Sequence, residues 1–194
     1  VNEILQSKRT VYGINTGFGI LAHTAIDPKD ANTLQHKILE SHSVGVGNPV
    51  SDEIVRLMLI TKLQSLAYGH SGVQPKTLER ILWHLENDAL PVVPEKGSVG
   101  ASGDLAPLAH LFLPLIGLGE VVWKGERMET AKMLNQTGLV PLKLGPKEGL
   151  ALINGTQFIL AHAVSGVSRM HGLLQTADVI GSLSLETFQG TNAP

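Results

Sequence analysis

The sequence predicts a mainly α-helical fold with one small β-hairpin, and three observations support that class. Apolar residues recur at spacings of three and four over most of the chain, which is the period of an amphipathic helix. Residues typical of helix starts and helix ends bracket these runs. Hydrophobic residues make up 43% of the 194 positions and charged residues 16%, a balance typical of a globular protein with one sizeable core. Because the chain contains neither a repeat nor a linker, we expect a single unit over residues 1–194.

Three helices are predicted in the first half of the chain. The first starts at Asp27-Pro28, an N-cap followed by a proline at the first helical position. The second starts at Ser51-Asp52-Glu53, whose acids suit the positive end of the helix dipole, and it ends at Gly69. The third runs from about Pro75 to Asn87. The expected inward faces are, in order, Ala31, Leu34, Ile38 and Ser41; Ile54, Leu57, Met58 and Thr61; and Leu78, Ile81, Leu82 and Leu85.

An extended passage then leads into an apolar helix. Pro91 and Pro94 predict the passage, because the residue before a proline is disfavoured in a helix. Asp104 is a candidate N-cap for a helix over Leu105–Leu118. We expect Pro114 to kink this helix, since proline removes a backbone hydrogen bond.

The remainder of the chain predicts a hairpin and two helical stretches. Val121–Trp123 and Glu126–Met128 flank Lys124-Gly125, which predicts a small β-hairpin. A short helix is expected over Thr130–Gln136. From about Lys147 to beyond Leu185 the pattern is helical and strongly apolar, and small residues in it would let neighbouring helices approach closely. These small residues are Gly155, Gly166, Gly172 and Gly181.

The segment Gly97–Ala106 reads Gly-Ser-Val-Gly-Ala-Ser-Gly-Asp-Leu-Ala and is the most informative part of the chain. If the amide nitrogen of Gly103 attacks the carbonyl carbon of Ala101, a five-membered ring forms with the loss of one water molecule. Loss of water from Ser102 then leaves an exocyclic methylidene. The product is 4-methylidene-imidazole-5-one, an electrophile that no ordinary side chain provides. Glycine supplies the unhindered nitrogen and the unusual backbone angles that such compression requires.

Three other interpretations of this segment were weighed. Glycine and serine clusters are most often turns. A serine nucleophile in a G-x-S-x-G elbow would need glycine where Asp104 stands. A phosphate cradle would need a following lysine and hydroxyl residue, whereas Asp104 would repel an anion. The triplet alone leaves the turn as the commonest interpretation, so the flanking residues and companion motifs have to decide.

Three further residues are functional candidates. Tyr12 lies in a glycine-rich loop, Val11–Gly19, whose weak side-chain anchoring is typical of a segment that closes over a substrate, or of a simple turn. As a general base it would need a phenol pKa well below about 10. His42 at a helix end either orients a polar substrate side chain or caps the helix. Asn154 next to Gly155 is unfavourable inside a helix, which indicates either a functional site or a buried structural amide.

Composition excludes several classes of function. The formal net charge is −2 without a basic run, which argues against nucleic acid as a partner. Cysteine is absent, so disulfides, cysteine-ligated zinc and thiol catalysis are excluded. No apolar run is long enough to span a membrane and no signal peptide is visible, so we expect a soluble cytoplasmic protein without a membrane partner. The other histidines have no metal-ligand spacing and are interpreted as structural: His23, His36, His70, His84, His110, His162 and His171.

Taken together, these motifs resemble those of the aromatic amino acid ammonia-lyases and aminomutases. The segment Gly97–Ala109 is similar to that family's prosthetic-group signature, and Tyr12–Gly19 is similar to its catalytic tyrosine loop. Leu152–Thr156 is similar to the segment with its substrate-binding asparagine. The three segments occur in family order, and the likeness runs over the whole chain. The resemblance implies the N-terminal, prosthetic-group-containing domain of the helical fumarase/aspartase-like lyase fold.

The resemblance also implies a role for each candidate. Ala101–Gly103 would form the methylidene-imidazolone with the help of Asp104. This electrophile would accept the substrate amine, while Tyr12 removes the β-proton. Asn154 would hold the substrate, and His42 would select its side chain. An electrophile is needed because the β-proton is too weakly acidic for a side-chain base alone.

The pair Ser41-His42 bears on the substrate. It resembles the pair found in histidine ammonia-lyases, which implies deamination of L-histidine to trans-urocanate and ammonia. Some tyrosine aminomutases carry the same pair. A tyrosine ammonia-lyase or tyrosine 2,3-aminomutase domain is therefore the alternative.

We also expect the chain to be part of a larger protein. It starts at Val1 without a methionine and ends at Pro194 without a closing element. Family subunits are well over twice this length and form homotetramers, in which each site combines residues of three chains. We therefore expect the C-terminal central helices to be absent and the chain alone to be monomeric and inactive. The further alternative is a folded, non-catalytic domain in which the ring is not formed.

Overall fold

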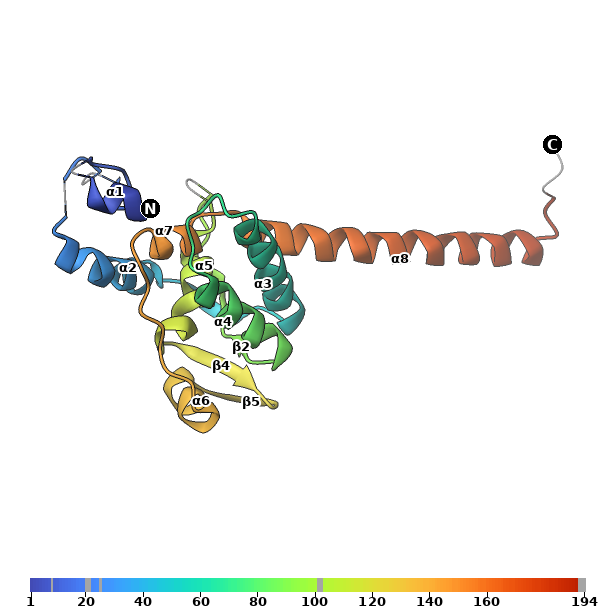
Figure 1. Cartoon of the computed structure of the whole chain (residues 1–194). Helices are drawn as coiled ribbons and strands as arrows, with labels where there is room; N and C mark the ends of the chain where they lie inside the picture. The colour runs from blue at the N-terminus through green and yellow to red at the C-terminus, as the bar shows by residue number, and fades with distance from the viewer. Residues whose placement is uncertain (8, 20–21, 25, 101–102, 192–194) are drawn as a thin grey trace. The chain divides into compact units, whose positions relative to one another are not determined.

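The computed structural model describes residues 1–7, 9–19, 22–24, 26–100 and 103–191, and helices dominate this part of the chain (Figure 1). The mainly helical prediction is confirmed. The α-helices are α1 Asn2–Gln6, α2 Pro28–His42, α3 Asp52–Ala67, α4 Pro75–Glu86, α5 Leu105–Phe112, α6 Thr130–Thr137, α7 Glu148–Ile153 and α8 Gln157–Thr187. A 3₁₀ helix, η2, covers Leu113–Ile116.

Two small antiparallel sheets accompany the helices in the described part of the chain. Strand β1 (Val46–Pro49) pairs with β3 (Pro94–Lys96), a ladder that the sequence did not predict. The other sheet has the order β2-β4-β5, from Leu90–Pro91, Glu120–Trp123 and Glu126–Glu129. Its β4–β5 part is the predicted hairpin.

The turn of this hairpin has a simple backbone explanation. Lys124 and Gly125 both have positive φ, 53° and 79°, as a two-residue turn that follows the strand twist requires. Val121 lies opposite Met128, and both side chains are buried. The inward face of the hairpin therefore packs in a second hydrophobic cluster, together with Met133 and Leu134 of the helix that follows it.

By its internal contacts the chain divides into two compact units, Val1–Ala161 and His162–Pro194. The first unit holds the two sheets and the helices from α1 to α7, together with the beginning of α8. The second consists mainly of the rest of α8. The candidate site residues all belong to the first unit.

Helix α5 is central to the first unit. Six of its eight residues are buried, and it contacts α2, α7, η2, β2 and β3. Helices α3 and α4 pack against each other beside it (Figure 1). A short apolar helix surrounded in this way fixes the position of the segment that enters it. That segment is the glycine-rich stretch ending at Asp104.

The predicted helix over Leu105–Leu118 is shorter than expected. Helix α5 ends at Phe112, and the chain continues as η2, with Pro114 in its first turn. Gly117 then ends η2 in the left-handed conformation, with φ of 83°. Because proline lacks an N–H, it changes the winding here instead of kinking a continuous helix.

The predicted long helix from Lys147 is interrupted. Helix α7 ends at Ile153, and Asn154 follows in an extended conformation, with φ of −84° and ψ of 115°. The next helix, α8, begins only at Gln157. Asn154 therefore lies in a break between two helices, and the expectation that it lies inside one was wrong.

Candidate functional site

A cavity of about 240 Å³ brings together three of the predicted site residues. Tyr12 comes from the N-terminal loop, His42 from the end of α2 and Asn154 from the break after α7. The cavity lies where α2, α5 and α7 contact one another. Its lining is otherwise mostly apolar and consists of Phe18, Gly19, Ile38, Leu105, Leu150 and Ile153. An apolar pocket with a few convergent polar groups is the usual form of a small-molecule site.

The Tyr12 loop is better anchored than the sequence suggested. The backbone N–H of Val11 donates to Asn15 Oδ1 at 2.7 Å, and that of Gly13 donates to Thr16 Oγ1 at 3.1 Å. Thr16 is buried. Tyr12 itself is 52% exposed and meets the Phe18 ring edge to face, with the centroids 6.4 Å apart. The loop therefore holds its tyrosine at the mouth of the cavity by side-chain hydrogen bonds.

The position of His42 is compatible with both roles that the sequence left open. Its Nδ1 lies 2.8 Å from the carbonyl oxygen of Ile38, one turn earlier in α2. Since a carbonyl can only accept, Nδ1 carries the proton and donates, which caps the helix end. In the neutral ring Nε2 is then left as an acceptor. His42 also lines the cavity, so capping and orientation of a ligand are compatible.

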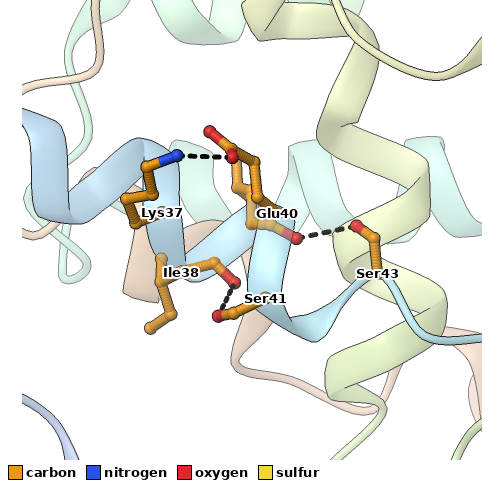
Figure 2. Close-up of polar contacts among 6 residues, drawn as sticks. Lys37, Ile38, Glu40, Ser41 and Ser43 are labelled. Atoms are coloured by element: carbon orange, nitrogen blue, oxygen red, sulfur yellow. Dashed lines mark hydrogen bonds and ion pairs between the residues drawn. The ribbon is translucent and has the colours of Figure 1, made fainter.

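The end of α2 is held by several local contacts, which Figure 2 shows. Ser41 Oγ donates to the carbonyl oxygen of Ile38 at 3.3 Å, and Ser43 Oγ donates to the carbonyl oxygen of Leu39 at 2.7 Å. An exposed ion pair joins Lys37 and Glu40 at 2.8 Å. Such surface pairs contribute little stability, so the hydrogen bonds are what fix the His42 segment.

Asn154 is fixed through its backbone by a residue that the sequence analysis did not single out. Lys62 Nζ donates to the carbonyl oxygen of Asn154 at 2.8 Å. The Lys62 side chain is only 1% exposed, and this burial lowers its pKa from 10.5 to about 8. One signal was present in the sequence, because Lys62 continues the buried stripe of α3. That stripe is Ile54, Val55, Met58, Leu59, Lys62 and Leu66, whereas the expected Leu57 and Thr61 are only half-buried.

Asp104 occupies the N-cap position of α5, but its carboxylate does not cap that helix. Oδ2 accepts the N–H of Ile159, in the first turn of α8, at 3.0 Å. Oδ1 accepts the hydroxyl of Ser98 at 2.7 Å. The predicted capping of the nearest helix is thus wrong, and the side chain, which is 0% exposed, caps a helix far along the chain.

The glycine-rich loop packs tightly against the α7–α8 break. Gly103 forms a parallel bridge with Gly155, and the Asp104 N–H donates to the Gly155 carbonyl at 2.7 Å. Gly103 has φ of 89°, and a Cβ there would overlap with the Gly155 carbonyl oxygen. Only glycine fits at this position. Ala101 and Ser102, the other two residues of the predicted ring, lie outside the described residues.

Three histidines have structural partners. Gly45 N–H donates to His110 Nε2 at 3.0 Å, and Leu144 N–H donates to His36 Nε2 at 3.2 Å. His84 Nδ1 lies 2.7 Å from the carbonyl oxygen of Ala89. Burial lowers the pKa of all three, that of His84 to about 4. These rings are therefore neutral near pH 7. Within the described part of the chain, no group of three or more histidine, aspartate or glutamate side chains could hold a metal ion.

Comparison with known proteins matches the chain over its full length. The model of the aromatic amino acid lyase family covers residues 1–194. The histidine ammonia-lyase of Desulfotalea psychrophila is 47% identical over 194 residues, which are 100% of this chain and 38% of that protein. The chain thus spans well under half the length of the curated relatives that it matches.

Solved structures agree with this result. The histidine ammonia-lyase of Trypanosoma cruzi superimposes with a TM-score of 0.91 at 38% identity, covering 99% of this chain and 37% of that one. The tyrosine aminomutase of Streptomyces globisporus gives a TM-score of 0.89 at 38% identity, covering 95% and 35%. Among the described residues, no helix has the length and apolar character needed to cross a membrane.

Proposed function

Because the chain belongs to the aromatic amino acid lyase family, we propose that it forms part of an ammonia-lyase that converts L-histidine into trans-urocanate and ammonia. One observation carries this proposal. Tyr12, His42 and Asn154, from three separate segments, line the same cavity. The base, the side-chain selector and the substrate-binding amide are thereby within reach of one small molecule.

The surroundings of Ala101–Gly103 fit the proposed prosthetic group. Gly103 has positive φ and no room for a Cβ, and Asp104 beside it is held by two donors. Strained backbone of this kind persists only where the surrounding structure over-determines it. The 4-methylidene-imidazole-5-one formed from these residues would supply an electrophilic carbon that turns the substrate amine into a good leaving group.

The residues of this chain then have distinct tasks. Tyr12 removes the β-proton from the side of the loop that it occupies. Asn154, which lines the same cavity, binds the substrate through its amide. The apolar lining residues exclude water from the substrate, which strengthens the polar contacts made there.

His42 selects the substrate through the free nitrogen of its ring. Since Nδ1 donates to Ile38, Nε2 accepts, and an imidazole N–H of L-histidine is a matching donor. A phenol hydroxyl is also a donor. A tyrosine ammonia-lyase or tyrosine 2,3-aminomutase is therefore the second candidate, and the likeness to the tyrosine aminomutase structure favours it.

We further propose that the 194 residues alone are inactive and that catalysis needs a larger assembly. The chain spans 38% of its relatives' length. Helix α8 exposes apolar side chains, among them Val167, Met170, Leu173 and Ile180. A helix that is apolar on most sides is typical of a buried position among other helices. We propose a homotetramer in the cytoplasm as the active form, which the absence of cysteine from the sequence also suits.

A chimera tests this function. Residues 1–194 replace the matching segment of the D. psychrophila histidine ammonia-lyase, and product formation is measured with L-histidine, L-tyrosine and L-phenylalanine. The chimera is expected to prefer L-histidine. The variant His42→Phe should lower kcat/KM for L-histidine by about 100-fold or more, because it removes the acceptor for the imidazole N–H.

His70→Phe is the matched control, since His70 is exposed in the turn after α3. It should leave the preference unchanged. A chimera that is active only on L-tyrosine would favour the second candidate. A chimera that assembles normally and acts on none of the three amino acids would refute the proposed function.

A further inference from the structure

Lys62 is a buried charge that the proposed chemistry does not use. It lies on the inward face of α3, where its neighbours one turn away are Met58, Leu59 and Leu66. Within the described part of the chain no carboxylate pairs with it. An unpaired buried ammonium is costly and persists only where something compensates it.

The compensation lies at the candidate site. Lys62 Nζ donates a hydrogen bond to the carbonyl oxygen of Asn154, the residue that follows the last turn of α7. Carbonyl groups at a helix C-terminus have no partners within the helix, and they carry the negative end of its dipole. A cation at this position therefore satisfies an orphan acceptor and is itself stabilised.

The next carbonyl along the break is held separately. Gly155 accepts the N–H of Asp104, whose carboxylate in turn accepts the N–H of Ile159 in α8. The break is thus held at two successive carbonyl groups by two different parts of the chain. Asp104 fixes Gly155 to the glycine-rich loop, which leaves Lys62 to fix Asn154.

We propose that Lys62 is a positioning residue that holds the Asn154 backbone so that the Asn154 amide faces the cavity. The assignment of substrate binding to Asn154 rests on the proposed function, whereas the positioning itself rests on the geometry of the break. Within the described part of the chain, Lys62 is the one hydrogen-bond donor to the carbonyl oxygen of the extended Asn154, so its removal lets α7 lengthen or fray at its end.

The test follows the Asn154 side-chain amide by NMR in the ¹⁵N-labelled 194-residue chain, with the signal identified by its loss in Asn154→Asp. In Lys62→Met the amide signal is expected to shift or broaden. In Lys62→Arg, which keeps a cationic donor, it should stay close to its original position. Lys76→Met is the matched control, because Lys76 also donates to a backbone carbonyl, that of Lys143, but from an exposed site on α4.

An unchanged Asn154 signal in Lys62→Met would overturn the proposal. If Lys62→Met does not fold, Lys62→Arg decides, because a displaced signal in the folded arginine variant contradicts positioning by a cationic donor. In the active chimera, Lys62→Met should lower kcat/KM by about 100-fold and Lys62→Arg should restore most of it. An inactive chimera would count against the proposed function alone, since the NMR result does not depend on turnover.

Discussion

Asp104 connects two segments that lie far apart in the sequence. Its carboxylate accepts from Ser98, which precedes it, and from Ile159, which lies in the first turn of α8. Its backbone N–H donates to Gly155 in the same region. One fully buried residue thereby fixes the glycine-rich loop against the break that carries Asn154.

Replacement of Asp104 by alanine is therefore expected to destabilise the fold. The variant leaves the Ser98 hydroxyl and the Ile159 N–H without their acceptor, which we expect to cost about 2–3 kcal/mol. Urea denaturation of the 194-residue chain measures this change in the free energy of unfolding. The control Asp88→Ala removes an exposed carboxylate paired with Arg56 and should have little effect. Equal changes in the two variants would contradict the bridging role of Asp104.

Gly103 has a steric role that can be separated from its backbone angle. Gly100→Ala and Gly103→Ala both place a side chain at positive φ, 69° and 89°. A Cβ at Gly100 meets no atom of the described residues within 4 Å, whereas at Gly103 it overlaps with the Gly155 carbonyl. Both variants suffer the penalty of an alanine at positive φ, and Gly103→Ala adds the steric strain against Gly155. We therefore expect Gly103→Ala to lower the free energy of unfolding by about 1–3 kcal/mol more than Gly100→Ala does. The midpoints of thermal unfolding of the two variants measure this difference. Equal midpoints would disprove the close approach of Gly103 to Gly155.

Lys62 should make stability depend on pH in the alkaline range. Its pKa is about 8 in the folded chain and 10.5 as the ordinary value. Between these values the unfolded chain binds a proton that the folded chain does not, so the free energy of unfolding rises with pH from 8 to 10.5. The difference amounts to about 3 kcal/mol. Denaturation of the parent and of Lys62→Met between pH 8 and 10.5 should show a rise in the free energy of unfolding only in the parent. If the free energy of unfolding changed with pH in the same way in both, the assignment of the rise to Lys62 would be contradicted.

At the level of elements, the α7–α8 break and its supports explain what the sequence could and could not predict. The periodicity of apolar residues predicted most of the helices, because it indicates which residues face the core. It missed the break at Asn154, since both helices continue the same apolar pattern on either side. The partners of the break, Lys62 and Asp104, lie 92 and 55 positions from the residues that they bind. No local rule connects residues at such distances.

The residues of the candidate site were predicted in part from the sequence. Tyr12, His42 and Asn154 were found from short motifs, and the fold brings them to one cavity. The sequence could not predict that Phe18 and the other apolar residues line the cavity, because this depends on where they lie in the folded chain and not on a local motif. Lys62 was detectable in principle, as a charge in the stripe of apolar residues on α3.

Glu148 offers a test of how α7 is positioned. Its buried carboxylate accepts from the N–H of Gln74, the Gln74 side-chain amide, the Thr77 hydroxyl and the N–H of Gly145. The start of α7 is thereby tied to the start of α4. Glu148→Gln presents an amide N–H₂ to these donors, which we expect to cost about 2–3 kcal/mol. Urea denaturation checks this, with the exposed Glu126→Gln as control. Equal stability of the two variants would contradict the role of Glu148 in positioning α7.

At the scale of the whole molecule, our proposal that the chain is an incomplete catalytic unit rests on its length and its surface. The chain matches its curated relatives over 38% of their length, and α8 exposes many apolar side chains. The cavity is lined by Tyr12, His42 and Asn154, for which we propose the roles of base, selector and substrate-binding amide, and its described lining residues include no cationic side chain that would bind a substrate carboxylate. We therefore expect the isolated chain to keep the full mass of its sequence and to release no urocanate.

The most direct test of the account is the intact mass of the chimera, measured together with its formation of urocanate from L-histidine. If Ala101–Gly103 is the precursor of the electrophile, the chimera weighs less than its sequence by two water molecules and forms urocanate. In Ser102→Ala it keeps its full mass apart from the substitution and forms none. A chimera that releases urocanate at full mass, or a Ser102→Ala variant as active as its parent, would contradict the central claim.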